Sequence, residues 1–188
     1  MQTEYGQRNA TLSRDELYHH LNIHRSSLKD VVQHFSLKPQ FQRRFSWRQI
    51  LRTIHDTNGA LLKQHYEKLL NQHPDCAELK EIGDLEKRLK EPLCSFPEMA
   101  TALGYKPDTM RRALHEGRLR LPFPEIALGK RMRRYRGFEV EFWCETGLQL
   151  DLPEAPKFVV PQTKEQPPSR THRNRIANAF FGTFEQKK

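Results

Sequence analysis

A run of cations directly before an aromatic segment is the strongest chemical feature of this sequence. Five basic side chains fall within seven residues, and an apolar run follows at once. They are Lys130, Arg131, Arg133, Arg134 and Arg136. Clustered arginine and lysine bind anionic groups such as phosphate. The pattern indicates positive charge held rigidly against a polyanion, with Phe138, Val140, Phe142 and Trp143 anchoring it to a core.

Other side chains that could do chemistry lack the partners they would need. His20 and His24 stand four residues apart in the spacing of a helical metal pair, but no third ligand supports them. The three cysteines are widely spaced without a CxxC motif and indicate ordinary reduced thiols. No glycine-rich phosphate loop, nucleophile elbow or paired-carboxylate motif occurs. We therefore expect no metal, no cofactor and no enzymatic activity.

The charge is distributed in blocks. The 188 residues are 36% hydrophobic and carry a net charge of +9. Residues 1–56 hold 9 basic and 5 acidic side chains, and residues 93–150 hold 10 and 7, whereas residues 57–92 hold 6 and 7. Basic blocks of this kind are typical of nucleic-acid binders, although ribosomal and membrane-surface proteins share them. With no apolar run of membrane-spanning length and no signal region, we expect a cytoplasmic protein.

The sequence repeats a helical pattern at a distance of 82 residues. Ser13–Glu16 and Ser95–Glu98 both have the capping-box spacing that begins a helix. The same shift aligns Leu17 with Met99, Leu21 with Leu103 and Leu28 with Met110. Each copy therefore predicts a short helix, a tight turn and a second short helix, which is the helix-turn-helix unit.

The second copy continues into a predicted β-hairpin, or wing. Gly104 suits the tight turn, and Pro107 opens the second helix, which Gly117 ends. Residues 119–123 and 132–136 alternate in polarity like strands, with a loop at 124–131 between them. A further helix is expected to begin near residue 138.

These residues resemble a known family. LGYKPDTMRRALHEGRL, followed by LPFPEIALGKRMRRYRGFEVEFW, is similar to the winged helix-turn-helix of excisionase and MerR-type DNA-binding proteins over about 93–147. LNIHRSSLKDVV and RRFSWRQILRTI resemble it over about 11–56, with a hairpin shorter by eight residues. The resemblance implies that the second helix of each copy enters the major groove and that the wing contacts the backbone or minor groove.

The resemblance also implies a set of DNA-binding residues. On the second helices we expect Arg25, Ser26, Lys29, Thr109, Arg111 and Arg112. On the wings we expect Arg43, Arg44, Lys130, Arg131, Arg133, Arg134 and Arg136. Arginine can bond guanine in bidentate fashion, whereas serine and lysine serve phosphates. Asp30 stands where the second copy has Arg112, so the first copy either reads bases or only grips phosphate.

The remaining segments indicate a linker and a tail. Residues 57–92 contain two leucine-rich stripes, 61–70 and 79–89, which predict a helical hairpin that packs within the chain or forms a dimer seam. From residue 151 a proline-rich stretch leads to a basic and aromatic tail, 170–184. Its expected partner-binding residues are Ile176, Phe180, Phe181 and Phe184.

The predicted fold is mainly α-helical with small β-hairpin wings. It comprises a winged helix-turn-helix at 1–56, a helical linker at 57–92, a second winged helix-turn-helix at 93–150 and a flexible tail at 151–188. The expected partner is double-stranded DNA in a bacterial, phage or mobile-element setting, with the chain acting as a transcriptional regulator or excisionase-like architectural factor. Two alternatives remain open. One is an adaptor that recruits a recombinase, replication or packaging enzyme, or a second copy, through its tail; the other is a protein-interaction scaffold.

Overall fold

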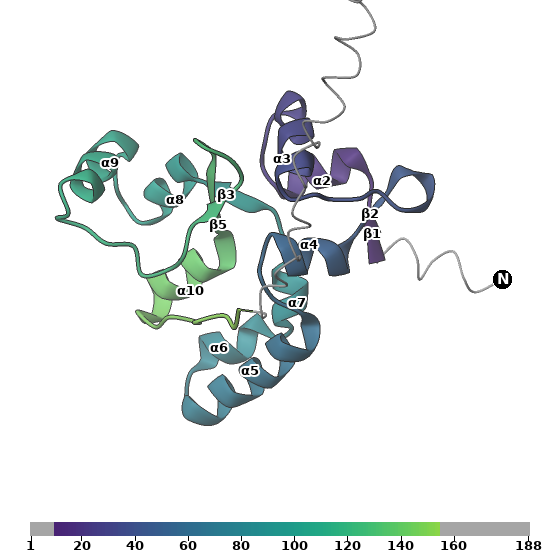
Figure 1. The fold of residues 1–188 in the computed structure, drawn as a ribbon. Coiled ribbons are helices and arrows are strands. Elements are labelled where there is room, and N and C mark those ends of the chain that lie inside the picture. Colours follow the sequence, from purple (N-terminus) through teal and green to yellow (C-terminus); the bar gives the residue numbers. More distant parts are fainter. Residues whose placement is uncertain (1–9, 155–188) are drawn as a thin grey trace, which may run out of the picture. The chain divides into compact units, whose positions relative to one another are not determined.

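The computed structural model describes residues 10–154, and this part of the chain is mainly helical with two small antiparallel sheets (Figure 1). The helices are α2 (Arg14–His20), η1 (Arg25–Ser27), α3 (Leu28–His34), η2 (Phe41–Arg43), α4 (Trp47–Thr53), α5 (Gly59–Gln72), α6 (Ala77–Ile82), α7 (Leu85–Arg88), α8 (Phe96–Ala102), α9 (Pro107–His115) and α10 (Gly137–Thr146). The strands are β1 (Thr11–Leu12), β2 (Phe45–Ser46), β3 (Leu93–Ser95), β4 (Ile126–Ala127) and β5 (Arg133–Arg136). The predicted tail residues Ile176, Phe180, Phe181 and Phe184 lie outside the described residues.

Both predicted capping boxes are present. The backbone N–H of Ser13 donates to the Glu16 carboxylate at 2.5 Å, and that of Ser95 donates to the Glu98 carboxylate at 2.6 Å. The serine hydroxyls accept from the glutamate N–H groups in return. These reciprocal bonds satisfy N–H groups that a helix start leaves without partners, so α2 and α8 begin where the sequence predicts.

The two sheets have equivalent registers. In the first sheet, Leu12 pairs with Phe45, and in the second, Cys94 pairs with Tyr135. The first members of these pairs are 82 residues apart (94 − 12), and the second members are 90 apart (135 − 45). The difference of eight residues equals the extra length of the second hairpin. In both copies a strand before the first helix therefore pairs with the strand that follows the hairpin.

The predicted wing strands are only partly correct. The strand expected at 119–123 is not formed; instead β4, at Ile126–Ala127, pairs with β5. Proline at 122 and 124 cannot donate to a sheet ladder, and Phe123 is buried in a core with Met110 and Tyr135. The alternation at 119–123 thus reflects core packing of an irregular segment.

The first copy has no strand equivalent to β4 among the described residues. Its short loop is closed by η2, where Gln42 and Arg43 both have positive φ, 56° and 59°. The N–H of Gln40 donates to the Arg44 carbonyl at 2.7 Å across this loop. The loop is therefore a tight turn in front of β2.

The middle helices pack within the chain. Leu62 and Leu69 of α5, Leu79 of α6 and Leu85 of α7 are buried in one core with Phe138 and Phe142 of α10. The second leucine stripe was expected on one helix, but it is divided between α6 and α7 at Gly83, whose φ is +67°. No helix in residues 10–154 is long and apolar enough to span a bilayer.

The hairpin of the second copy packs on the first copy. Ile126 and Leu128 share a core with Leu17, Leu28 and Ile50, which belong to the first copy. A separate core within the second copy contains Met99, Met110, Tyr135 and Val140. Contacts between the copies therefore depend on the hairpin and on β3.

A buried polar cluster also joins the copies. Arg136 Nη1 donates to Glu139 at 3.1 Å, and its Nη2 donates to the His55 carbonyl at 3.3 Å. His55 Nε2 lies 3.4 Å from His20 Nε2. All four residues are buried. Burial lowers the pKa of His20 to about 4 and that of His55 well below its usual value, so both imidazoles are neutral at pH 7.

Acid is expected to destabilise the protein through this cluster. The unfolded chain protonates His20 below a pKa of 6.5, whereas the folded chain does so only near 4. Folding stability therefore falls as pH drops from 6.5 towards 4, by on the order of 3 kcal/mol from His20. Burial raises the pKa of Glu139 above 4.5, so above pH 4.5 this carboxyl makes folding stability fall as pH rises, which is opposite to the effect of the histidines. Urea unfolding across this range isolates the histidine contribution as the difference between the wild type and His20→Gln. Parallel pH profiles for the two would contradict the assignment.

Candidate nucleic-acid interface

Helix α9 presents a polar face to solvent, as predicted. Met110 is fully buried, and Ala113 and Leu114 are half-buried. The opposite face exposes Asp108, Thr109, Arg111, Arg112 and His115. Because one turn of the helix separates these residues, they form a continuous hydrophilic strip along α9.

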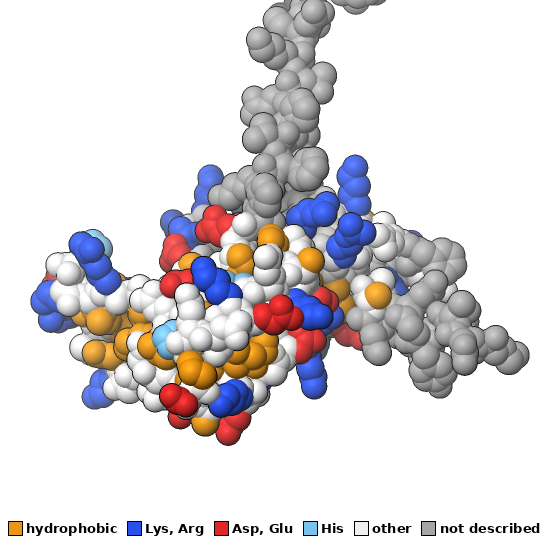
Figure 2. All heavy atoms as spheres, turned by 90° about the horizontal axis from the view of Figure 1, so that it is seen from below, with side chains coloured by type: hydrophobic (Ala, Val, Ile, Leu, Met, Phe, Trp, Pro, Cys, Tyr) orange, Lys and Arg blue, Asp and Glu red, His pale blue; other side chains and the backbone are white. Residues whose placement is uncertain are grey.

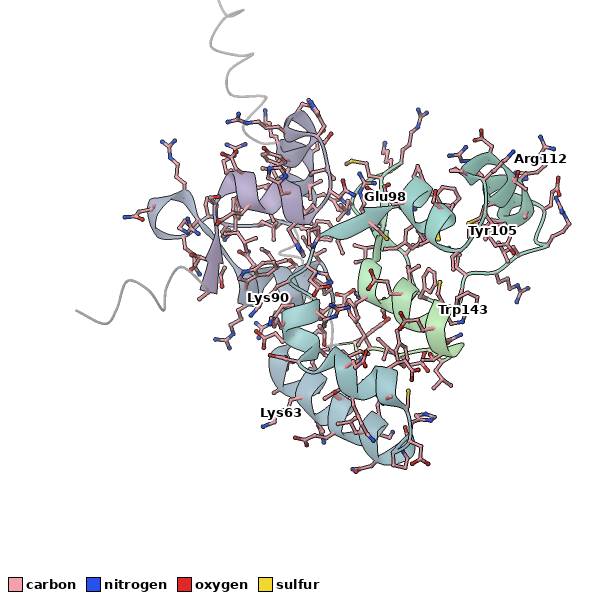
Figure 3. The ribbon with its side chains drawn as sticks, turned by 180° about the vertical axis from the view of Figure 1, so that it is seen from behind. Lys63, Lys90, Glu98, Tyr105, Arg112 and Trp143 are labelled. Carbon is pink, nitrogen blue, oxygen red and sulfur yellow. The ribbon has the colours of Figure 1, made fainter. Side chains whose placement is uncertain are left out.

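The two arginines on this strip differ in their contacts. Arg111 Nη1 donates to Asp108 at 2.6 Å, and its guanidinium carbon lies 5.3 Å from the centre of the Phe96 ring. Arg111 is thus held against its own helices. Arg112 makes no hydrogen bond or ion pair with the described residues, and Figure 3 shows it on the side of α9 turned away from α8. Arg112 is therefore the cation of α9 most available to a ligand.

The five cations of the wing divide into exposed and internally bonded groups. Lys130 and Arg131 lie exposed in the loop between β4 and β5. Arg133 forms an ion pair with Glu125 at 2.9 Å, across the hairpin, with 40% of its side chain exposed. The loop tip therefore carries the accessible charge, and Arg133 stabilises the hairpin.

Arg136 is a correction to the predicted DNA-binding set because it is buried, and Arg134 is partly committed to internal bonds. Arg134 donates from Nε and Nη2 to the Asn22 carbonyl, at 2.9 and 2.6 Å. Arg136 is only 7% exposed and is committed to Glu139 and His55. Both guanidinium groups join the copies. Arg136 is buried and so is withdrawn from the surface, whereas Arg134 is half-buried and is less available to a ligand than Lys130 and Arg131.

The first copy exposes a similar but weaker set. Arg25 and Ser26 of η1 and Lys29 of α3 are exposed. The N–H of Ser26 donates to His24 Nδ1 at 3.4 Å, which makes His24 a helix cap. Asp30 is also exposed beside Lys29, so the net positive charge on this face is smaller.

The first-copy wing has one exposed arginine. Arg43 is exposed at the turn, at a positive φ. Arg44, in contrast, pairs with Glu16 at 3.0 Å and donates from Nε to the Thr11 hydroxyl at 2.8 Å. Arg44 is therefore a structural contact within the first copy and is less available to a ligand than Arg43.

Sequence reasoning missed Lys106. It is exposed immediately before α9, beside the exposed Tyr105. Its position at the helix start, where N–H groups point outwards, was a usable signal, because helix N-termini favour anionic ligands.

The exposed cations of the candidate interface belong to elements that lie on one side of the described unit. Helices α3 and α9 and the β4–β5 hairpin lie towards the top of Figure 1, and α5–α7 lie at the bottom. Figure 2 views the α5–α7 side, where acidic and basic side chains are interspersed.

The described residues contain no group of three or more side chains suited to hold a metal ion. A comparison of the chain with protein-family models, with curated proteins and with solved structures found no significant match in any of the three. The function is therefore inferred from the geometry of the interface itself.

Proposed function

We propose that the chain is a sequence-specific duplex DNA-binding protein built from two tandem winged helix-turn-helix domains. In this proposal, α9 is the recognition helix of the second domain and the β4–β5 loop is its wing. Helix α3 and the turn at 41–43 have the same roles in the first. The resemblance to excisionase and MerR-type proteins favours a transcriptional regulator or an excisionase-like architectural factor.

The observation that carries this proposal is the placement of the exposed cations. Arg112 and Lys106 on or beside α9, together with Lys130 and Arg131 on the loop, have no bonded partner among the described residues. A helix with one face buried and a cationic face exposed has the dimensions to enter the major groove. The adjacent loop can then reach the phosphate backbone.

A protein-interaction scaffold is a weaker candidate. Such a scaffold would use exposed aromatic anchors on the wings. Among the side chains that the structure describes, Tyr105 is the one large hydrophobic group that is exposed, and it lies in the α8–α9 turn. An adaptor that recruits a DNA-processing enzyme remains compatible with duplex binding, and its predicted tail lies outside the described residues.

Selection of bound sequences from a random duplex library tests the proposal. A sequence-specific reader enriches a defined motif and prefers the duplex to its separated strands. Equal binding to single strands, with no enriched motif, would contradict sequence-specific duplex recognition.

The two recognition helices are expected to differ in the same experiment. Arg112→Ala should cost about 1–3 kcal/mol and relax the enriched motif at one position, because arginine bonds base edges. Lys29→Ala should weaken binding to all sequences alike, since lysine serves phosphates and Asp30, at the position of Arg112, cannot donate to the O6 and N7 acceptors of guanine. The ranking fails if Lys29→Ala changes the motif as much as Arg112→Ala.

A further inference from the structure

The turns after α2 and α8 have the same backbone geometry. Asn22 and Gly104, 82 residues apart, both have positive φ, 50° and 76°. The Asn22 N–H donates to the His19 carbonyl at 3.0 Å, and the Gly104 N–H donates to the Thr101 carbonyl at 2.9 Å. The two turns therefore have the same hydrogen-bonded form.

The first of these turns is docked on the second copy. The Asn22 carbonyl accepts two bonds from Arg134, and the Asn22 side-chain amide donates to Glu98 at 2.7 Å. The next residue, Ile23, is 8% exposed and belongs to the core that also contains Ile126. Glu98 and Arg134 thus form a socket for the Asn22 turn.

An equivalent socket exists in the first copy. Glu16 lies 82 residues before Glu98, and Arg44 lies 90 residues before Arg134, in agreement with the shifts of the helices and sheets. Glu16 and Arg44 are paired at 3.0 Å, and their side chains are 58% and 27% exposed. In Arg134 the Nε and Nη2 groups hold the Asn22 carbonyl, whereas in Arg44 they donate to Thr11 and Glu16. The Nη1 group of Arg44 has no acceptor among the described residues and is the donor left for a further partner.

The equivalent turn of the second copy, at Gly104 and Tyr105, is exposed. Tyr105, at the position of Ile23, is 44% exposed. The Gly104 carbonyl accepts no hydrogen bond from the described part of the chain. Figure 3 shows Tyr105 and Glu98 on different parts of the second copy, so the free turn and the occupied socket are separate surfaces.

We propose that the Gly104–Tyr105 turn of one chain docks on the Glu16–Arg44 socket of a second copy. The contact corresponds to the one that Asn22 makes within a chain, with Arg44 Nη1 as the donor to the Gly104 carbonyl in place of Nε and Nη2 of Arg134. Because the turn and socket are different surfaces, the interface is heterologous, and the chains assemble head to tail. This inference does not depend on DNA binding.

The contact between chains is expected to be weaker than the one within a chain. Glycine at 104 lacks the amide with which Asn22 reaches Glu98, and the described side chains of the short first-copy loop include no counterpart of Ile126 and Leu128. Association therefore becomes extensive when chains are concentrated, for instance on neighbouring sites of one duplex.

Sedimentation velocity over a range of protein concentrations, without DNA, tests the proposal. Gly104→Asn supplies the missing amide at a φ that asparagine tolerates, with no atom within 4 Å of the added Cβ. It should strengthen association about tenfold, the effect of one hydrogen bond to a charged group. Tyr105→Asp breaks the turn and Arg44→Ala breaks the socket, and each should weaken association about tenfold or more.

Mixing the two disrupted variants gives the sharpest result. The intact turn of Arg44→Ala fits the intact socket of Tyr105→Asp, so the mixture should form dimers and no longer species. Thermal melts establish that each variant is folded. If Arg44→Ala does not fold, the strengthened association expected of Gly104→Asn tests the proposal by itself. The proposal is overturned if the wild type and Gly104→Asn both stay monomeric at the highest soluble concentration. It is also overturned if the mixture assembles as far as the wild type.

Discussion

Replacing Arg136 with alanine is expected to lower the free energy of unfolding by about 3–5 kcal/mol. The change removes the partner of Glu139, whose side chain is 4% exposed, and leaves that carboxylate uncompensated in the core. It also removes the donor to the His55 carbonyl, which joins the two copies. Chemical denaturation monitored by circular dichroism measures the loss.

Arg133→Ala is the matched control for this change. Arg133 belongs to the same strand, but its pair with Glu125 is 40% and 49% exposed, so its loss should cost no more than about 1 kcal/mol. A double change, Arg136→Met with Glu139→Leu, should recover much of the stability lost in Arg136→Ala, because it removes both buried charges. Equal costs for Arg136→Ala and Arg133→Ala would show that the buried cluster is not a structural joint.

Local patterns predicted the helical part of this fold well. Capping boxes at Ser13 and Ser95 place the starts of α2 and α8, because a cap depends on residues within one turn. The strand at 126–127 was missed, since Ile126 is buried by packing against first-copy residues such as Leu17 and Leu28, which are distant in sequence. Gly83 was likewise overlooked inside a leucine pattern that continues across it.

The candidate site was predictable in its location but not in the role of each cation. All five basic residues at 130–136 look alike in sequence. Their roles are set by acceptors far along the chain: Arg134 bonds to a carbonyl 112 residues away, and Arg136 bonds to one 81 residues away. No periodicity or local spacing contains that information, so the surface cations Lys130 and Arg131 could not be separated from the buried ones.

Removing the accessible cations of the second copy is expected to reduce affinity for duplex DNA about a thousandfold, or about 4 kcal/mol. The variant carries alanine at Arg112, Lys130 and Arg131. Each lost phosphate or base contact contributes to the loss of affinity. The fold is preserved because none of the three side chains is bonded to the described residues. Fluorescence anisotropy with a short labelled duplex measures the change.

The matched control carries alanine at three exposed lysines of the opposite side, Lys63, Lys68 and Lys80. It has the same loss of net charge, and Figure 3 shows Lys63 on the middle helices, away from Arg112. Its affinity for duplex DNA should stay within a few-fold of the wild type. Equal losses in the two variants would mean that binding follows net charge alone.

The salt dependence of duplex affinity in the wild type and these two variants tests the central claim most directly. If Lys130 and Arg131 neutralise backbone phosphates, their loss makes the slope of log K against log salt less steep by about 2, at about 0.9 per phosphate. The lysine control should keep the wild-type slope. The account is contradicted if the wild type shows a flat salt response, or if the Arg112, Lys130 and Arg131 variant keeps the wild-type slope and affinity.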